Sequence, residues 1–399
     1  MPLRKLSLTA AGCISAILIL VPGAAALMFS SQALEQVRTV EKREPAALTS
    51  LMTESMDWRD PAAWNAVAAA LSDRIPSRVH LTRMLHGIER DRFGRRLFDK
   101  VVACPGPWMY YTRALDRAPT TVEQMDRALA TLRALSNAEP DRFYLAPPPD
   151  KVSIYPEPLC THRWIYEAKL SEREALQNYF ATSSSPALID TWSPLRAEKI
   201  RSSRPLYFRT DTHHNNAGAL IYARTLIDSI APGSWGDAAI TFGAPVSSRR
   251  DLVELAGLPG PTEADIPFTM QRPGVRADAC YAFGEEIDCA DIFSPPRYRI
   301  RVRAVSSERL PLIPGRTLII HDSFVHGFLK PVLWQYFEDL SYIVFDDIEL
   351  DELAASFATY DRIIISRVER YLRRMIDGIG RLPADGLVTT RQPGLDPDG

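Results

Sequence analysis

Two short segments of the sequence carry the side chains of a serine-dependent acyl-transfer site. Asp211 and His213 lie two residues apart, just before a stretch with helical spacing. A carboxylate at this spacing can orient an imidazole and stabilise the imidazolium that forms when the ring takes a proton. Ser323 follows the apolar run Thr317–Ile320. We therefore interpret Ser323 as a candidate nucleophile, His213 as its general base and Asp211 as the residue that orients the base.

Each segment also has a simpler explanation. Asp322 or Ser323 can serve only as the cap of the helix that follows, and an Asp-x-His sequence can lie in a solvated turn. A metal-dependent hydrolase is a further alternative, in which His214 and His321 join the aspartate and histidine as ligands. Adjacent ligands on a short loop match no recognised metal spacing, so we expect no metal.

Strands and helices alternate along the chain, which predicts an α/β fold with a mostly parallel sheet. The expected helices cover residues 61–74, 79–91, 120–136, 171–182, 217–230 and 323–340, with a last helix that ends near residue 378. The expected strands cover residues 101–103, 143–146, 187–190, 317–320 and 362–365, and residues 275–305 are rich in β-forming side chains. A side chain that follows strand 317–320 would leave the sheet at its carboxyl edge, where open α/β folds bind ligands and a helix N-terminus can stabilise an oxyanion.

The N-terminal segment predicts export. Arg4 and Lys5 precede a stretch without charged side chains that extends from residue 6 to residue 34. At ~1.5 Å per residue this stretch is long enough for one membrane-spanning helix, with the following chain outside. An uncleaved signal anchor suits its length better than a signal peptide cut near Ala24–Ala26. We expect the anchor or signal peptide at residues 1–34, a stalk at 35–60, one domain at 61–382 and a flexible tail at 383–399.

Four cysteines outside the N-terminal segment fit an oxidising compartment. They are Cys104, Cys160, Cys280 and Cys289, and they can pair in three ways. Cys280 and Cys289 flank a short hairpin candidate that contains glycine, so they are a natural local pair, and Cys104 with Cys160 would follow. Four unpaired buried thiols are the alternative.

Composition limits the class of protein. The chain has 399 residues, of which 46% are hydrophobic and 24% charged, which is typical of a globular protein and excludes a disordered chain or a polytopic membrane protein. A formal net charge of -2 argues against a nucleic-acid partner.

A stripe of arginines lies in the β-rich region. It consists of Arg297, Arg299, Arg301 and Arg303, which would share one face of a strand. Such a face can bind the carboxylates of a uronic-acid polysaccharide. Alternatively, it is a solvated face paired with acids such as Glu285 and Glu286.

The order of motifs resembles the alginate O-acetyltransferase family, the SGNH-hydrolase-like exported acetyltransferases of bacterial exopolysaccharide pathways. The resemblance rests on LSDRIPSRVHLTRMLHGIERDRFG, KVVACPGPWMYY, FYLAPPPDKVSIYPE, DTHH, DLVELAGLPG, HDSF and TYDRIIISRVERYL, in this order. It extends from about Trp64 to Arg374, and seven weak motifs in the right order make a specific match. At two positions the chain departs from the pattern: His321 replaces a glycine and His214 replaces a tryptophan. With Arg209 and the arginine stripe, these two histidines are candidate substrate contacts.

The resemblance implies a three-layer SGNH-like sandwich in which the chain order Asp, His, Ser is the reverse of that in ordinary SGNH hydrolases. It also implies an acetyl group carried on Ser323 and delivered to hydroxyls of an exported polysaccharide in the periplasm, without a cofactor. A membrane-bound O-acyltransferase would supply the acetyl group, and the N-terminal helix would hold the protein at the inner membrane. A carbohydrate acetylesterase with the same triad and a non-catalytic polysaccharide-binding or scaffold subunit remain alternatives.

Overall fold

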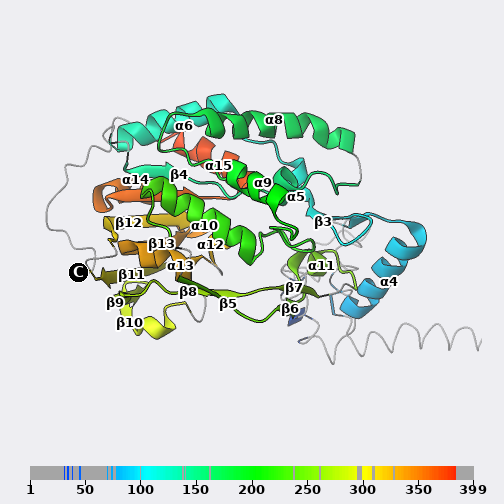
Figure 1. Ribbon diagram of the computed structural model, residues 1–399. Helices are drawn as coiled ribbons and strands as arrows, with labels where there is room; N and C mark the ends of the chain where they lie inside the picture. The colour runs from blue at the N-terminus through cyan, green and yellow to red at the C-terminus, as the bar shows by residue number, and fades with distance from the viewer. Residues whose placement is uncertain are drawn as a thin grey trace, which may run out of the picture. The chain divides into compact units, whose positions relative to one another are not determined.

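The computed structural model describes most of the chain after residue 77. The described residues are 78–98, 100–136, 139, 141–160, 163–236, 239–259, 262–293, 299–307, 311–326 and 329–382, with a few isolated residues before 78 (Figure 1). The expected membrane segment, almost all of the stalk and the C-terminal tail lie outside these residues. Within the described part, no helix is both long and apolar enough to cross a bilayer.

The chain forms two compact units. The first consists of residues 1–101 and 249–261, and the second of residues 102–248 and 262–399. In the first unit, helix α4 (Arg78–Phe93) confirms the predicted helix at 79–91, and β1 (Leu97–Phe98) and α11 (Asp251–Leu255) are further elements of its described part. The expected boundaries near residues 34 and 60 stay predictions.

A seven-stranded mixed sheet forms the centre of the second unit, in the order β10-β9-β11-β13-β12-β14-β4. Its strands are β4 (Phe143–Leu145), β9 (Val275–Ala282), β10 (Glu285–Ile287), β11 (Arg299–Ser306), β12 (Ile313–His321), β13 (Phe337–Val344) and β14 (Arg362–Ser366). The pairs β13–β12, β12–β14 and β14–β4 are parallel, and the other three are antiparallel. The prediction of a mostly parallel sheet is therefore wrong for one half, because the β-rich region 275–305 joins the same sheet as its antiparallel half.

Helices cover both faces of the parallel half of the sheet, as expected for three layers. Leu318 and Ile320 face one core, to which α6 (Val122–Leu135), α8 (Arg163–Thr182), α14 (Leu350–Thr359) and α15 (Glu369–Ile379) contribute. Ile319, between them, faces a second core, to which α10 (Asn216–Ile230) and α13 (Lys330–Leu333) contribute. This alternation follows from the two-residue period of a strand.

The remaining elements are short. They are β2 (Val101–Ala103), β3 (Met109–Tyr111), α5 (Thr112–Asp116), α7 (Lys151–Ile154), α9 (Trp192–Arg201), β5 (Ile240–Phe242), β6 (Val246–Ser248), β7 (Glu263–Asp265), β8 (Phe268–Met270), η3 (Cys289–Asp291), α12 (Ser323–His326), η4 (Trp334–Tyr336) and η5 (Phe345–Asp347). The strands expected at 101–103, 143–146, 317–320 and 362–365 are confirmed, whereas 187–190 supplies only one bridge, from Leu188 to Leu145. Helix α6 begins after Thr121, whose side chain forms a capping box with Gln124.

The helix expected at residues 323–340 is wrong. The chain instead forms α12, α13 and η4 and then β13, which is the strand between β11 and β12. Pro331 lies within this stretch and cannot continue a helix that began several residues earlier. Strand β13 is buried on both faces at most positions, so it lacks the alternation of polar and apolar residues by which an exposed strand is recognised.

Both expected disulfides are present. Cys104 bonds to Cys160, and Cys280 on β9 bonds to Cys289. The hairpin between the second pair turns at Phe283 and Gly284, whose φ angles of 53° and 87° are both positive, as in the two-residue turns that match strand twist.

Burial of the sheet predicts a stability contrast between two isoleucines. Ile319 is fully buried in β12, whereas the side chain of Ile200 is 85% exposed on α9. We expect Ile319→Ala to lower the free energy of unfolding by about 2–5 kcal/mol, from lost burial and the cavity left behind. Ile200→Ala should change it by less than about 0.5 kcal/mol. Urea denaturation of both variants measures the difference, and equal effects would contradict the assignment of the core.

Candidate active site

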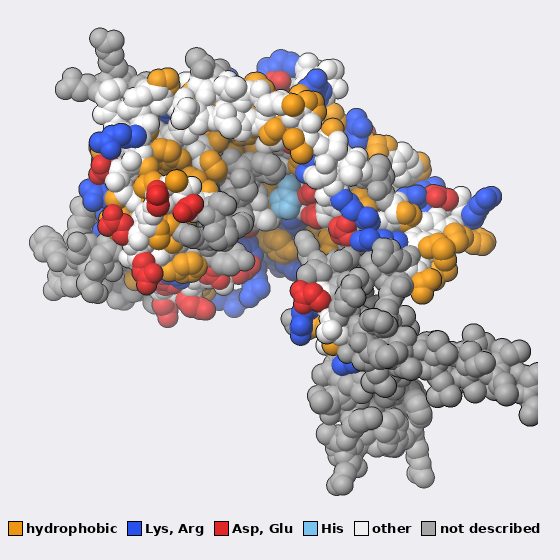
Figure 2. All heavy atoms as spheres, turned by 90° about the horizontal axis from the view of Figure 1, so that it is seen from below, with side chains coloured by type: hydrophobic (Ala, Val, Ile, Leu, Met, Phe, Trp, Pro, Cys, Tyr) orange, Lys and Arg blue, Asp and Glu red, His pale blue; other side chains and the backbone are white. Residues whose placement is uncertain are grey.

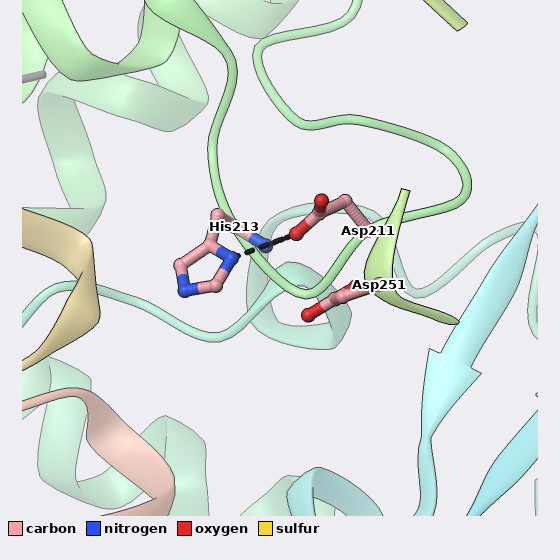
Figure 3. Close-up of side chains that lie close together, drawn as sticks. All are labelled: Asp211, His213 and Asp251. Carbon is pink, nitrogen blue, oxygen red and sulfur yellow. Dashed lines mark hydrogen bonds and ion pairs between the residues drawn. The ribbon is translucent and has the colours of Figure 1, made fainter. Parts of the chain in front are cut away.

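Three predicted side chains meet in the second unit. The Nε2 atom of His213 lies 2.8 Å from Oγ of Ser323, and its Nδ1 atom lies 2.7 Å from Oδ1 of Asp211. Figure 3 shows the Asp211 carboxylate directed at the imidazole ring. The Ser323 side chain is exposed, and those of His213 and Asp211 are 23% and 13% exposed, so the serine end of this chain of contacts is open to a ligand.

Asp322 fixes the position of Ser323 at the end of β12. Its Oδ1 accepts a hydrogen bond from the Phe324 N–H at 3.0 Å, and its Oδ2 accepts one from the Val368 N–H at 2.8 Å. The carboxylate therefore joins the start of α12 to the loop that follows β14. Asp322 therefore caps the start of α12, and Ser323 faces His213. Helix α12 has only four residues, so the expected helix-dipole contribution to an oxyanion site is small.

Lys151 holds the loop that carries Asp211 and His213. Its buried ammonium donates to the carbonyls of Phe208, Arg209 and Asp211 at 3.1, 2.9 and 2.6 Å. Three backbone acceptors satisfy the three donors of an ammonium group and fix the loop on that side. Lys151 was not among the predicted site residues, although it lies in FYLAPPPDKVSIYPE, one of the segments on which the family resemblance rests.

Glu263 holds the same loop from the other side. Its carboxylate accepts hydrogen bonds from the N–H groups of Arg209 and Thr210 at 2.9 and 3.0 Å, and from the Thr210 hydroxyl at 2.7 Å. The backbone of Arg209 thus positions the loop, while its side chain is exposed. No motif in the sequence indicates this role of Glu263.

His214 is buried, which corrects its assignment as a substrate contact. Its ring has no exposed surface and packs near Tyr207, Tyr222 and Phe324, with ring centroids 6.2, 6.2 and 5.1 Å away. Among the described residues, neither ring nitrogen has a hydrogen-bond partner. Burial, with a further contribution from the neighbouring His213, lowers the pKa of His214 to about 3. His214 is therefore a neutral packing residue behind the general base.

His321 is also fully buried, and its Nδ1 atom lies 2.8 Å from the Asp322 carbonyl oxygen. Its placement argues against direct contact with a substrate. The metal-hydrolase alternative needed both His214 and His321 as ligands. In the described part of the chain, neither of them lies in a group of metal-ligating side chains with His213.

The arginine stripe is largely paired with acids. Arg299 binds Glu352 at 2.7 and 3.0 Å, and Arg301 binds Asp339 at 2.9 and 2.7 Å. Arg303 is exposed at the other end of the same face, and Arg297 lies outside the described residues. The shared face is confirmed for Arg299, Arg301 and Arg303. The salt-bridge alternative describes it better than the polysaccharide site does, although the acids are not Glu285 and Glu286.

A cavity of about 530 Å³ opens beside Ser323. Its basic lining consists of Arg113, Arg117, Arg367 and Arg374, and the other lining residues are Asp322, Ser323, Val344, Asp346, Val368 and Tyr371. Arg367 forms an ion pair with Asp346 at 3.2 Å. The lining carries four positively charged guanidinium groups and two carboxylates, those of Asp346 and the capping Asp322. The net charge of the lining is therefore positive. None of these four arginines was selected in the sequence analysis, because they come from segments far apart in the chain.

Tyr371 is the aromatic centre of this arginine-lined cavity. The guanidinium carbons of Arg117, Arg367 and Arg370 lie 4.6, 5.2 and 5.2 Å from the centroid of its ring. Burial acts to raise the pKa of the Tyr371 hydroxyl, but the charge of Arg370 and hydrogen bonds from neighbours including Arg113 outweigh burial and lower it. The tyrosine thus reports a positive potential next to Ser323.

A buried ion-pair network holds α15, the helix whose residues Tyr371 and Arg374 line the cavity. Arg370 pairs with Asp150, and Arg173 contacts both Asp150 and Glu369 at 3.3 Å. The Arg370 guanidinium also lies 5.4 Å from the Phe324 ring, next to the serine. Because breaking a buried ion pair leaves an uncompensated charge, this network fixes α15 relative to α8 and the residues before α7.

The three-layer fold with this serine–histidine contact belongs to the SGNH-hydrolase-like α/β class. Residues 101–271 match the family model of the SGNH hydrolase-like domain of acetyltransferase AlgX, which confirms the resemblance found in the sequence. The matched stretch contains Lys151, Asp211 and His213 but ends before Ser323. No curated protein sequence matches the chain.

Several solved structures are similar in fold. PatB1 of Bacillus cereus, with a sulfonyl adduct, has 16% identity and a TM-score of 0.46 over 68% of this chain and 97% of that one. A DHHW family protein of Eubacterium siraeum has 12% identity and a TM-score of 0.47 over 70% and 93%. The O-acetyltransferase domain of Pseudomonas putida AlgJ has 17% identity and a TM-score of 0.43 over 70% and 98%. Similarity of this extent carries no information about the reaction.

The depressed pKa of His214 predicts acid sensitivity. The folded protein keeps this ring neutral down to about pH 3, whereas the unfolded chain protonates it near its ordinary pKa of 6.5. Its contribution to stability is therefore complete above pH 6.5 and is lost as the pH falls from there towards 3. Between pH 7 and pH 5, we expect His214 to lower the free energy of unfolding of the native protein by ~2 kcal/mol. The variant His214→Phe should not show this part of the loss. Tyr222→Phe, a nearby buried change without an imidazole, should shift stability equally at both pH values. Unfolding curves with the same pH dependence for the native protein and His214→Phe would contradict this account.

Proposed function

We propose that the protein is an O-acetyltransferase that carries an acetyl group on Ser323 and transfers it to a hydroxyl group of an exported polysaccharide. The observation that carries this proposal is the continuous contact from Ser323 through His213 to Asp211, with the serine end open. The match of residues 101–271 to an acetyltransferase family model supports the choice of acyl group.

The geometry suits a two-step reaction with one general base. In the first step, Oγ of Ser323 attacks the acetyl carbonyl of the donor while Nε2 of His213 takes its proton, and the imidazolium then protonates the leaving group. Asp211 stabilises the imidazolium. In the second step, His213 takes the proton of an acceptor hydroxyl, whose oxygen attacks the acyl-enzyme and releases Ser323, which regains its proton.

The arginine-lined cavity suggests an acceptor that carries carboxylates. Its four arginines lie beside Ser323, whereas Arg299 and Arg301 of the predicted stripe are engaged with their own acids. Guanidinium groups bind carboxylates through paired hydrogen bonds, so a uronic-acid polysaccharide fits this cavity. An acceptor held here would also compete with water for the acyl-enzyme, which separates a transferase from an acetylesterase.

The proposed setting is the periplasm, with a membrane-bound O-acyltransferase as the acetyl donor partner. Two disulfides support an oxidising compartment. A donor partner in the membrane and a tether at residues 1–34 of this chain would bring the acetyl group to Ser323.

Mass spectrometry after brief exposure to an activated acetyl ester tests the acyl-enzyme. We expect one acetyl adduct on Ser323, no adduct in Ser323→Ala, and a loss of turnover in that variant by a factor of at least about 10⁴. Ser203→Ala, a change at an exposed serine remote in sequence, should change neither the adduct on Ser323 nor the turnover. An adduct discharged equally fast with and without glycan would identify an acetylesterase. Unchanged turnover in Ser323→Ala would exclude the proposed mechanism.

Charge in the acceptor tests the arginine-lined cavity. With a polyuronate acceptor we expect Arg117→Gln or Arg374→Gln to raise KM about tenfold, with kcat nearly unchanged, since only a binding contact is lost. With the same polymer after reduction of its carboxyl groups, these variants should behave like the native protein. Arg303→Gln, a change at an exposed arginine of the stripe, is the matched control. If Arg303→Gln raised KM more than the cavity variants, the acceptor would bind at the arginine stripe on β11 instead.

A further inference from the structure

Helix α4 of the first unit carries an apolar stripe on its surface. Leu81, Met84, Leu85 and Ile88 are 49%, 54%, 54% and 44% exposed. Their spacing of i, i+3, i+4 and i+7 places all four on one face of the helix. Phe93, the last residue of α4, and Leu97 on β1 are also exposed, at 80% and 52%. Figure 2 shows hydrophobic side chains gathered over α4 with Lys and Arg side chains beside them.

The opposite face of α4 is already used for packing within the first unit. Arg83 pairs with Glu254 at 2.6 Å, and Nδ1 of His86 lies 2.7 Å from the Ala256 carbonyl oxygen. A Cβ atom at Gly87 would meet the Pro259 ring at 2.8 Å, so this face is in close contact with residues 249–259. The exposed stripe is therefore not an unused core face, because the helix already has its core contacts on the other side.

Charge around the stripe favours one kind of partner. Residues 78–100 contain seven basic and three acidic side chains, a net charge of +4 in a chain whose total is -2. Among the basic residues, Arg92 directly precedes Phe93 and Arg96 directly precedes Leu97. A helix with exposed leucine, isoleucine and phenylalanine beside arginines has the composition of helices that lie in the interface of an anionic membrane.

We propose that the apolar stripe of α4 lies on the surface of a membrane that contains anionic lipids. The leucines and Ile88 enter the boundary between headgroups and acyl chains, and the arginines contact the lipid phosphates. This contact is separate from the proposed reaction and does not depend on it. It would also act independently of the N-terminal segment, as a second attachment that restricts how the first unit turns at the membrane.

The test measures the depth of one side chain in full-length protein. A nitroxide label is attached at Ile88→Cys in a Cys13→Ser background, where the other four cysteines are engaged in disulfides. Ile200→Cys is the matched control, because Ile200 is an exposed isoleucine on a helix of the second unit. The protein is reconstituted into vesicles of phosphatidylcholine with phosphatidylglycerol, or of phosphatidylcholine alone. Label relaxation by oxygen and by a water-soluble nickel chelate reports membrane depth.

With anionic vesicles we expect the nickel accessibility at position 88 to fall at least about fivefold while oxygen accessibility rises, with no change at position 200. Arg92→Gln together with Arg96→Gln should weaken the effect of anionic lipid about fivefold per arginine. A label at position 88 that stays accessible to nickel in vesicles would overturn the proposal. So would a label already shielded without lipid, because a second copy or another segment of the chain would then cover the stripe.

Discussion

The hydrogen bond between His213 and Ser323 is the interaction on which the site depends. It joins residues 110 positions apart in the chain at 2.8 Å, so it exists only if both loops are held within a fraction of an ångström. Asp322 holds the serine side through two backbone N–H groups. Lys151 and Glu263 hold the histidine side through backbone groups of residues 208–211. The contact between His213 and Ser323 thus rests on three buried or half-buried charges, those of Asp322, Lys151 and Glu263.

Charged side chains in this protein divide into structural and available groups. Arg370 is buried and paired with Asp150, and although burial acts to lower its pKa, that carboxylate raises it above the usual value. Arg299 and Arg301 are similarly held by acids on neighbouring elements. An arginine held in this way stabilises the fold but has little capacity left for a ligand. In the arginine-lined cavity, four arginines face two carboxylates, so more positive charge is left unbalanced there than along the arginine stripe. The proposed acidic acceptor would therefore bind in the cavity.

The two histidines that depart from the family pattern have a common explanation in packing. His214 and His321 are both buried, and His214, kept neutral by its lowered pKa, fills its space without the cost of a buried charge. The low pKa of His214 has the useful consequence that no second positive charge forms beside His213 at neutral pH. These substitutions alter the wall behind the site and leave the contact between His213 and Ser323 intact.

The sequence by itself indicated the local features: the triad candidates, the local pair Cys280–Cys289, α4, α6 and the buried strands β12 and β14. These follow from residue type and short-range spacing, which the chain carries in any conformation. Only the tertiary structure decided that residues 337–344 form a central strand, because burial on both faces removes the alternation that marks a strand. It alone also decided which arginines line the cavity beside Ser323. Pairing with Glu352 or Asp339, and convergence of α5 and α15 beside Ser323, depend on contacts between segments far apart in the chain.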